Sequence, residues 1–184
     1  INLLTIVYLP MQHHCDDLIS LFDRCFAVDF NTRLVGGNPE PEYLPADADN
    51  SAHRILFTRD YFRSALHETA HWCVAGADRR LLPDFGYWYA PDGRTADQQR
   101  VFEQAEVKPQ ALEWIFCAAS GHRFDVSTDN LSGEATDSEP FRAKVHAQAL
   151  AYLDAGLAER PQRFALALLA FYRPGMQLNA QLVI

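Results

Sequence analysis

A run of seven residues, from Leu66 to Trp72, constrains this chain more than any other part of it. The run has the pattern His-Glu-x-x-His, with His67 and His71 four positions apart and Glu68 next to the first histidine. On an α-helix, side chains four positions apart lie one turn above each other, so both imidazoles can reach one metal ion. The pattern predicts a metal site, although an ordinary buried helix with two hydrogen-bonded histidines would carry the same residues.

The sequence around this run has the features of a helix. No proline or glycine occurs between residues 60 and 75, and Gly76 follows at a position where helices commonly end. Asp60 is the candidate N-cap at the other end. Apolar residues recur at helical spacing: Phe62, Leu66, Ala70 and Cys73. We expect a helix whose apolar stripe faces the core and whose histidines lie on the adjoining face.

The rest of the sequence predicts an α+β fold, a mostly helical single domain with a small β-sheet. Apolar residues follow helical or strand patterns in several segments: residues 13–26, 54–58, 98–120, 141–157 and 163–172. Three consecutive aromatic residues at 87–89 favour another strand, and residues 36–39, Gly-Gly-Asn-Pro, predict a turn.

The length of 184 residues and the 48% hydrophobic content are sufficient for one core. We place the domain at residues 11–174. Residues 1–10 form an apolar leader, which is either upstream of a native start at Met11 or a short edge strand. This leader is too short to span a bilayer, so no membrane role is expected.

Charge and cysteine usage narrow the class of protein. The net charge of -8 argues against nucleic-acid binding through a broad basic surface, and it suits a cationic substrate better. The four cysteines lack CxxC spacing and lie in apolar stretches. They are therefore expected to be reduced, buried thiols of a cytoplasmic protein.

A second informative stretch surrounds Pro109. This proline lies inside the helical pattern of residues 98–120, where it removes an amide donor, so the helix should kink or restart there. Glu106 sits at that break and is a candidate for a carboxylate aimed inward. Without the upstream histidines, Glu103, Glu106 and Glu113 would all be interpreted as a solvated helix face.

Two imidazoles and one carboxylate leave coordination positions open, and two kinds of chemistry use such a set. With zinc, the pKa of bound water falls, Glu68 serves as the base, and the outcome is hydrolysis. With ferrous iron, dioxygen and a substrate can both be accommodated, and the outcome is oxygenation. The identity of the ligands alone does not choose between them.

Seven blocks of the sequence together resemble the elongation factor P hydroxylases. They are DFNTRL at 29–34, YLPADAD at 43–49, HETAHWCVAG at 67–76, DFGYWYAPDGR at 84–94, FEQAEVKPQALEW at 102–114, VSTDNL at 126–131 and ERPQRF at 159–164. The resemblance runs from about Met11 to Tyr172. It implies a metal-dependent monooxygenase that hydroxylates the β-lysylated lysine of translation elongation factor P.

The resemblance also implies a ligand set, which maps onto His67, His71 and Glu106. The expected cofactors are Fe(II), with another divalent metal as the alternative, and dioxygen; the electron donor is not defined. Glu68 is then a catalytic residue that is not a ligand, and it either orients the site or contacts the substrate ammonium. Three aspartates are expected to bind the cationic substrate: Asp47, Asp84 and Asp92.

Two other functions are compatible with the motif. One is a zinc metallopeptidase of the HExxH type, which the position of Glu68 favours. The other is a non-catalytic, metal-stabilised module that binds a translation factor.

Overall fold

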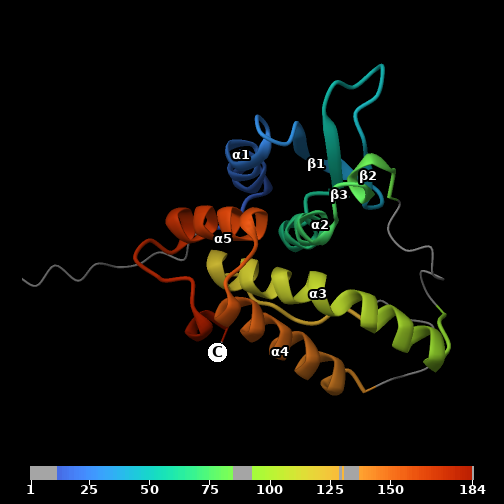
Figure 1. Cartoon of the computed structure of the whole chain (residues 1–184), viewed down its shortest axis with the longest axis vertical. Helices are drawn as coiled ribbons and strands as arrows, with labels where there is room; N and C mark the ends of the chain where they lie inside the picture. Colours follow the sequence, from blue (N-terminus) through green and yellow to red (C-terminus); the bar gives the residue numbers. More distant parts are fainter. Residues whose placement is uncertain (1–11, 85–92, 129, 131–136, 184) are drawn as a thin grey trace, which may run out of the picture.

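The structure is a computed structural model that describes residues 12–84, 93–128, 130 and 137–183. Within these ranges the chain folds into helices around one core, with a small three-stranded sheet beside them (Figure 1). In chain order the elements are α1 (Cys15–Phe26), β1 (Thr32–Asn38), β2 (Glu42–Leu44), β3 (His53–Thr58), α2 (Phe62–Val74), the short 3-10 helix η1 (Arg79–Leu81), α3 (Ala96–Ser120), α4 (Glu139–Ala155), α5 (Glu159–Tyr172) and the 3-10 helix η2 (Ala180–Val183). The predicted α+β class with a predominance of helix is confirmed.

The last strand of the sheet, β3, leads directly into α2. Its strand order is β1-β3-β2, with β1 parallel to β3 and β2 antiparallel to it. The turn predicted at residues 36–39 is wrong for its first three residues, which belong to β1. The reason is a close approach, because a Cβ on Gly36 would lie 2.8 Å from the Phe57 ring. Glycine at this position lets β1 pass over that ring, so the residue serves packing and not a turn.

Aromatic side chains join α1, α2 and α5 into the core. The ring of Trp72 lies 5.4 Å from that of Phe22 and 4.8 Å from that of Phe26. Phe164 of α5 lies 6.0 Å from Phe22. These rings are almost fully buried, and their edge-to-face and tilted contacts hold the three helices at fixed distances.

The helix α2 spans Phe62–Val74, close to the range that the sequence predicts. The predicted N-cap at Asp60 is wrong, since the N-cap residue is Tyr61 and no side chain caps the helix there. At the other end, Arg160 of α5 donates to the carbonyl oxygens of Trp72 and Ala75, both at 2.7 Å. Cationic groups at a helix C-terminus satisfy its last carbonyls and complement its dipole.

The helix α3 runs without interruption from Ala96 to Ser120, so it does not restart at Pro109. A capping box between Thr95 and Gln98 starts it, and Gly121, with φ of 74°, ends it in the left-handed conformation. The helix packs against α2, α4 and α5. Contacts on three sides offset the loss of one backbone hydrogen bond at the proline, which costs about 3 kcal/mol in an unsupported helix.

Some of the expectations fall on residues that the structure does not describe. The leader at residues 1–10, the aromatic strand at 87–89 and Asp92 lie outside the described ranges. Among the described helices, none combines the length and the apolar character that crossing a membrane requires.

Candidate metal centre and the cavity beside it

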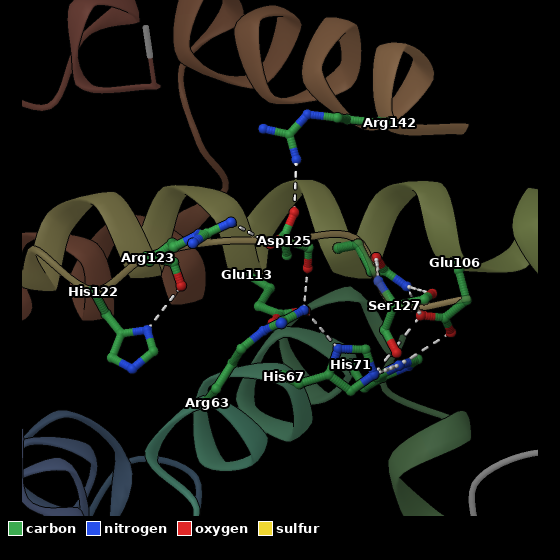
Figure 2. Close-up of polar contacts among 11 residues, drawn as sticks. Arg63, His67, His71, Glu106, Glu113, His122, Arg123, Asp125, Ser127 and Arg142 are labelled. Atoms are coloured by element: carbon green, nitrogen blue, oxygen red, sulfur yellow. Dashed lines mark hydrogen bonds and ion pairs between the residues drawn. The ribbon is translucent and has the colours of Figure 1, made fainter. Parts of the chain in front are cut away.

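Three side chains from α2 and α3 meet at the contact between these helices (Figure 2). His67 and His71 come from α2 and Glu106 comes from α3, and each offers one ligand atom within 4.8 Å of the others. The two Nε2 atoms lie 3.0 Å apart. Glu106 Oε1 lies 3.2 Å from His71 Nε2, and its Oε2 lies 3.7 Å from His67 Nε2. The α-helical spacing of four thus brings both imidazoles to the same carboxylate.

This donor set fits a divalent metal ion. Two imidazole nitrogens and one carboxylate oxygen are the donors of a two-histidine, one-carboxylate site, and such a site would leave further coordination positions of the ion open. The Glu106 side chain is 1% exposed, whereas those of His67 and His71 are 16% and 35% exposed. A buried carboxylate is costly without a cation, so its location opposite two imidazoles favours a binding role.

The charges at the site perturb one another. Burial alone would lower the pKa of His67, but the negative charge of Glu113, its hydrogen bond and the charge of Glu106 together raise that pKa to about 10. Burial would likewise raise the pKa of Glu106. The charge and hydrogen bond of His71, the charge of His67 and a hydrogen bond from Gln110 outweigh burial and lower it to about 2. The pocket thus favours a cation next to an ionised Glu106.

Polar side chains behind His67 and Glu106 hold these two candidate ligands in place. Glu113 of α3, 1% exposed, accepts a hydrogen bond of 2.8 Å from His67 Nδ1. Glu113 also accepts one of 2.7 Å from Nε of Arg63. On the other side, Gln110 donates to Glu106 Oε2 at 3.1 Å and exchanges two hydrogen bonds with the backbone of Ser127.

A cavity of about 320 Å³ opens beside the candidate ligands. Its walls come from the sheet, α2, η1 and α3, and they combine apolar side chains with ionisable ones. The apolar and aromatic lining residues include Tyr43, Ile55, Trp72, Val74, Ala105 and Pro109, and the ionisable ones are Glu42, Glu68, His71, Arg79, Arg80, Asp84 and Glu106. The shape and chemistry suit an aliphatic chain that carries a polar end.

Glu68 lines this cavity and is not one of the three clustered candidate ligands. No hydrogen bond or ion pair connects it to any residue in the described part of the chain. Burial, partly offset by the charges of His67 and His71, raises its pKa. A carboxylate in this environment gains stabilisation from an incoming cation.

The three aspartates predicted to bind substrate have different surroundings. Asp84 lines the cavity, where it forms an ion pair of 2.7 Å with Arg79. Asp47 does not line it; its carboxylate accepts hydrogen bonds from Asp49 and Asn50 in its own turn and pairs with Arg54 at 3.2 Å. Asp92 is not described. The substrate-binding role stays a prediction for each of the three aspartates.

Sequence reasoning missed the residues behind the ligands, although their spacing carried a signal. Glu113 lies seven residues after Glu106, and Gln110 lies four after it, so α-helical geometry places all three on one face. Arg63 likewise lies four residues before His67. Nothing in the sequence indicated which helix this polar face would meet.

Comparison with known proteins identifies the family of this chain. A family model described as elongation factor P hydroxylase matches residues 21–182. The chain belongs to this family. A curated relative from Haemophilus influenzae, named Elongation factor P lysine hydroxylase, is 49% identical over 169 residues, which is 92% of this chain and 95% of the relative. The family resemblance of the sequence blocks is therefore confirmed.

Membership in the elongation factor P hydroxylase family favours an enzyme over a docking module. It also weighs against the peptidase that the HExxH pattern alone would allow, because the match extends far beyond the five residues of that pattern.

Proposed function

We propose that this protein is a metal-dependent hydroxylase that acts on a lysine of elongation factor P, in its β-lysylated form. The observation that carries the proposal is that two of the candidate ligands, His71 and Glu106, border the same cavity as Glu68. Among the described residues the Glu68 carboxylate has no ion-pair partner. The printed name of the relative, a lysine hydroxylase of elongation factor P, supports the same reaction and substrate. Modification of a translation factor would place the protein in the cytoplasm.

In this proposal His67, His71 and Glu106 hold the metal ion, with Fe(II) as the preferred ion. A redox-active ion held by these three side chains would supply the activation of dioxygen. Insertion of one oxygen atom into a C–H bond leaves the other to be reduced to water, so an electron donor completes the reaction.

The residues of the cavity bind and orient the substrate. Tyr43, Ile55 and Trp72 provide apolar walls against which the methylene groups of a lysyl side chain can pack. Glu68 accepts the substrate ammonium, and because the cavity is partly shielded from water this ion pair is stronger than one at the surface. Fixing the amine in this way also fixes which carbon of the chain lies nearest the candidate ligands.

The acidic character of the protein contributes to substrate capture. A net charge of -8 attracts a chain that carries amines, and this attraction weakens as salt rises. Asp84 remains a proposed substrate contact at the cavity wall, through displacement of Arg79 from their ion pair.

Mass spectrometry of the substrate tests the proposed function. Purified β-lysylated elongation factor P is incubated with the Fe(II)-loaded protein, dioxygen and a chemical reductant. We expect a mass increase of one oxygen atom on the modified lysine, and none with H67A. Hydrolysis of a peptide bond by the zinc-loaded protein, without any oxygen added by the iron form, would instead establish a peptidase.

The role of Glu68 is tested separately by E68Q. Loss of a shielded ion pair should raise KM for the lysylated factor about tenfold, with a smaller change in kcat. The matched control is E139Q, because Glu139 is exposed at the start of α4. A fall in kcat at unchanged KM would contradict the binding role and assign Glu68 to the chemical step.

A further inference from the structure

Glu113 is a buried carboxylate on α3 that no chemical step of the proposed function requires. Its side chain is 1% exposed, and each of its two oxygens accepts a hydrogen bond. Burying an ionisable group costs several kcal/mol unless its partners are well placed, and a hydrophobic residue would often be as stable there. A carboxylate at such a position therefore calls for a reason other than packing.

The two oxygens of Glu113 have different partners. Oε1 accepts a hydrogen bond of 2.7 Å from Arg63 Nε, and Oε2 accepts one of 2.8 Å from His67 Nδ1. Because Arg63 occupies Oε1, the carboxylate cannot turn away from the imidazole without breaking a charged hydrogen bond. The Nδ1 side of His67 is thus tied to α3.

Fixing Nδ1 also determines where the opposite nitrogen points. Nε2 of His67 is directed toward the cluster, 3.0 Å from His71 Nε2 and 3.7 Å from Glu106 Oε2. A neutral imidazole that donates through Nδ1 carries its lone pair on Nε2, which is the form that binds a metal. The hydrogen bond to Glu113 selects that tautomer and that ring orientation.

Arg63 is itself anchored at its far end. Its Nη2 donates to the backbone carbonyl of Asp125, and its guanidinium lies 5.4 Å from the centre of the Phe124 ring. The Asp125 carboxylate in turn pairs with Arg142 of α4 at 3.1 Å (Figure 2). Contacts therefore connect α4 to His67 through Asp125, Arg63 and Glu113, and they hold the Glu113 carboxylate in its orientation.

We propose that Glu113, held by Arg63, is a positioning residue that presents His67 Nε2 to the metal ion. The proposal rests on the proposed function only in that a metal binds at His67, His71 and Glu106. Glu113 touches neither the substrate nor the metal in this account; it acts through His67. Residues that orient metal-bound imidazoles commonly change metal affinity about 10- to 100-fold when they are replaced.

Titration with Co(II) of the metal-free protein tests this role without relying on catalysis. In E113Q we expect Co(II) affinity to fall about 10- to 100-fold and the visible spectrum of the bound ion to change. The matched control is E103Q, the same substitution on the same helix, where Glu103 accepts a hydrogen bond from Gln99 and not from a candidate ligand. E103Q should bind Co(II) as the wild type does.

A second variant, R63K, keeps the test decisive if E113Q does not fold. Arg63 is 33% exposed, so its replacement by lysine is milder, and one ammonium cannot reproduce the contacts with both Glu113 and Asp125. We expect a loss of Co(II) affinity of up to about tenfold. Circular dichroism of the metal-free variants establishes that the titrated protein is folded.

The outcomes separate this inference from the proposed function. If folded E113Q and R63K bind Co(II) as tightly and with the same spectrum as the wild type, the positioning role of Glu113 is overturned and the metal centre stands. If the wild type itself binds no Co(II), the metal centre is overturned, and the inference falls with it.

Discussion

The two sides of α2 meet different kinds of partner. On one side Leu66 and Ala70 are completely buried in an apolar core. On the other side His67 and His71 face two carboxylates of α3, and their side chains retain 16% and 35% exposure. The first side holds the helix in the fold, and the second is available for chemistry. One helix can do both because its periodicity separates residues that are neighbours in sequence.

The comparison also shows what each side requires from the rest of the chain. The apolar side needs only partners of suitable size, and aromatic rings from α1 and α5 supply them. The polar side needs groups of defined type and direction, and α3 supplies Glu106, Gln110 and Glu113 along one face. Substitutions on the two sides should therefore affect different properties.

The largest effect is expected from H71A on the polar side. Loss of a ligand should lower Co(II) affinity by more than about a hundredfold, beyond the loss for an outer supporting residue, and should remove hydroxylation. The side chain is 35% exposed, so its truncation leaves no buried cavity, and the metal-free fold should lose only the stability that His71 gives to the buried Glu106 carboxylate. Optical titration and thermal unfolding of the metal-free protein measure the two properties. Tight Co(II) binding by H71A would remove this residue from the ligand set.

On the apolar side, L66A should produce the opposite pattern. Leu66 is fully buried, so the cavity left by its truncation should cost about 2 to 5 kcal/mol in the free energy of unfolding. Molecules that remain folded should still bind Co(II) with nearly wild-type affinity, which titration at low temperature would measure. A loss of affinity comparable to that of H71A would show that the two sides of α2 do not act independently.

A smaller, graded effect is expected from pH. Protonation of His67 competes with the metal, and because its pKa is raised to about 10, Co(II) affinity should increase by up to about tenfold per pH unit between pH 6.5 and 10. Calorimetry in buffers of different ionisation enthalpy should detect protons released on binding. Affinity that does not change over this range would contradict the exchange of a proton for the metal.

In the metal-free protein the raised pKa of His67 has the opposite consequence, because stability falls as the pH rises. The raised pKa means that His67 contributes stability fully below pH 6.5 and loses that contribution as the pH rises toward 10. Glu106, with its pKa lowered to about 2, contributes above pH 4.5 and loses its contribution as the pH falls toward 2. Metal-free protein should therefore lose stability at both ends, as urea unfolding across this pH range would measure.

The two sides of α2 also differ in how well the sequence predicts them. The apolar stripe was evident from the periodicity of Phe62, Leu66 and Ala70, and the structure buries all three. Local signals for helix ends and breaks are less reliable. Asp60 does not cap α2, and α3 continues through Pro109 because its contacts with neighbouring helices support it.

The polar side could be predicted only in part. His67, His71 and Glu106 were proposed together, from the motif and from the family resemblance, and the structure brings them together. The sequence assigns Glu113 no role, because its burial depends on α2 packing against that face of α3, which no pattern within α3 specifies. Contacts between the site residues of α2 and α3 depend on how the two helices pack against each other. An apolar core stripe depends on the periodicity of a single helix.

X-ray absorption spectroscopy of the anaerobic Fe(II)-loaded protein tests the central claim most directly. We expect one iron per chain, with scattering from two imidazoles and from oxygen ligands and none from sulfur. Substoichiometric iron, or a sulfur neighbour from a thiol such as Cys73, which is buried two residues beyond His71, would contradict it.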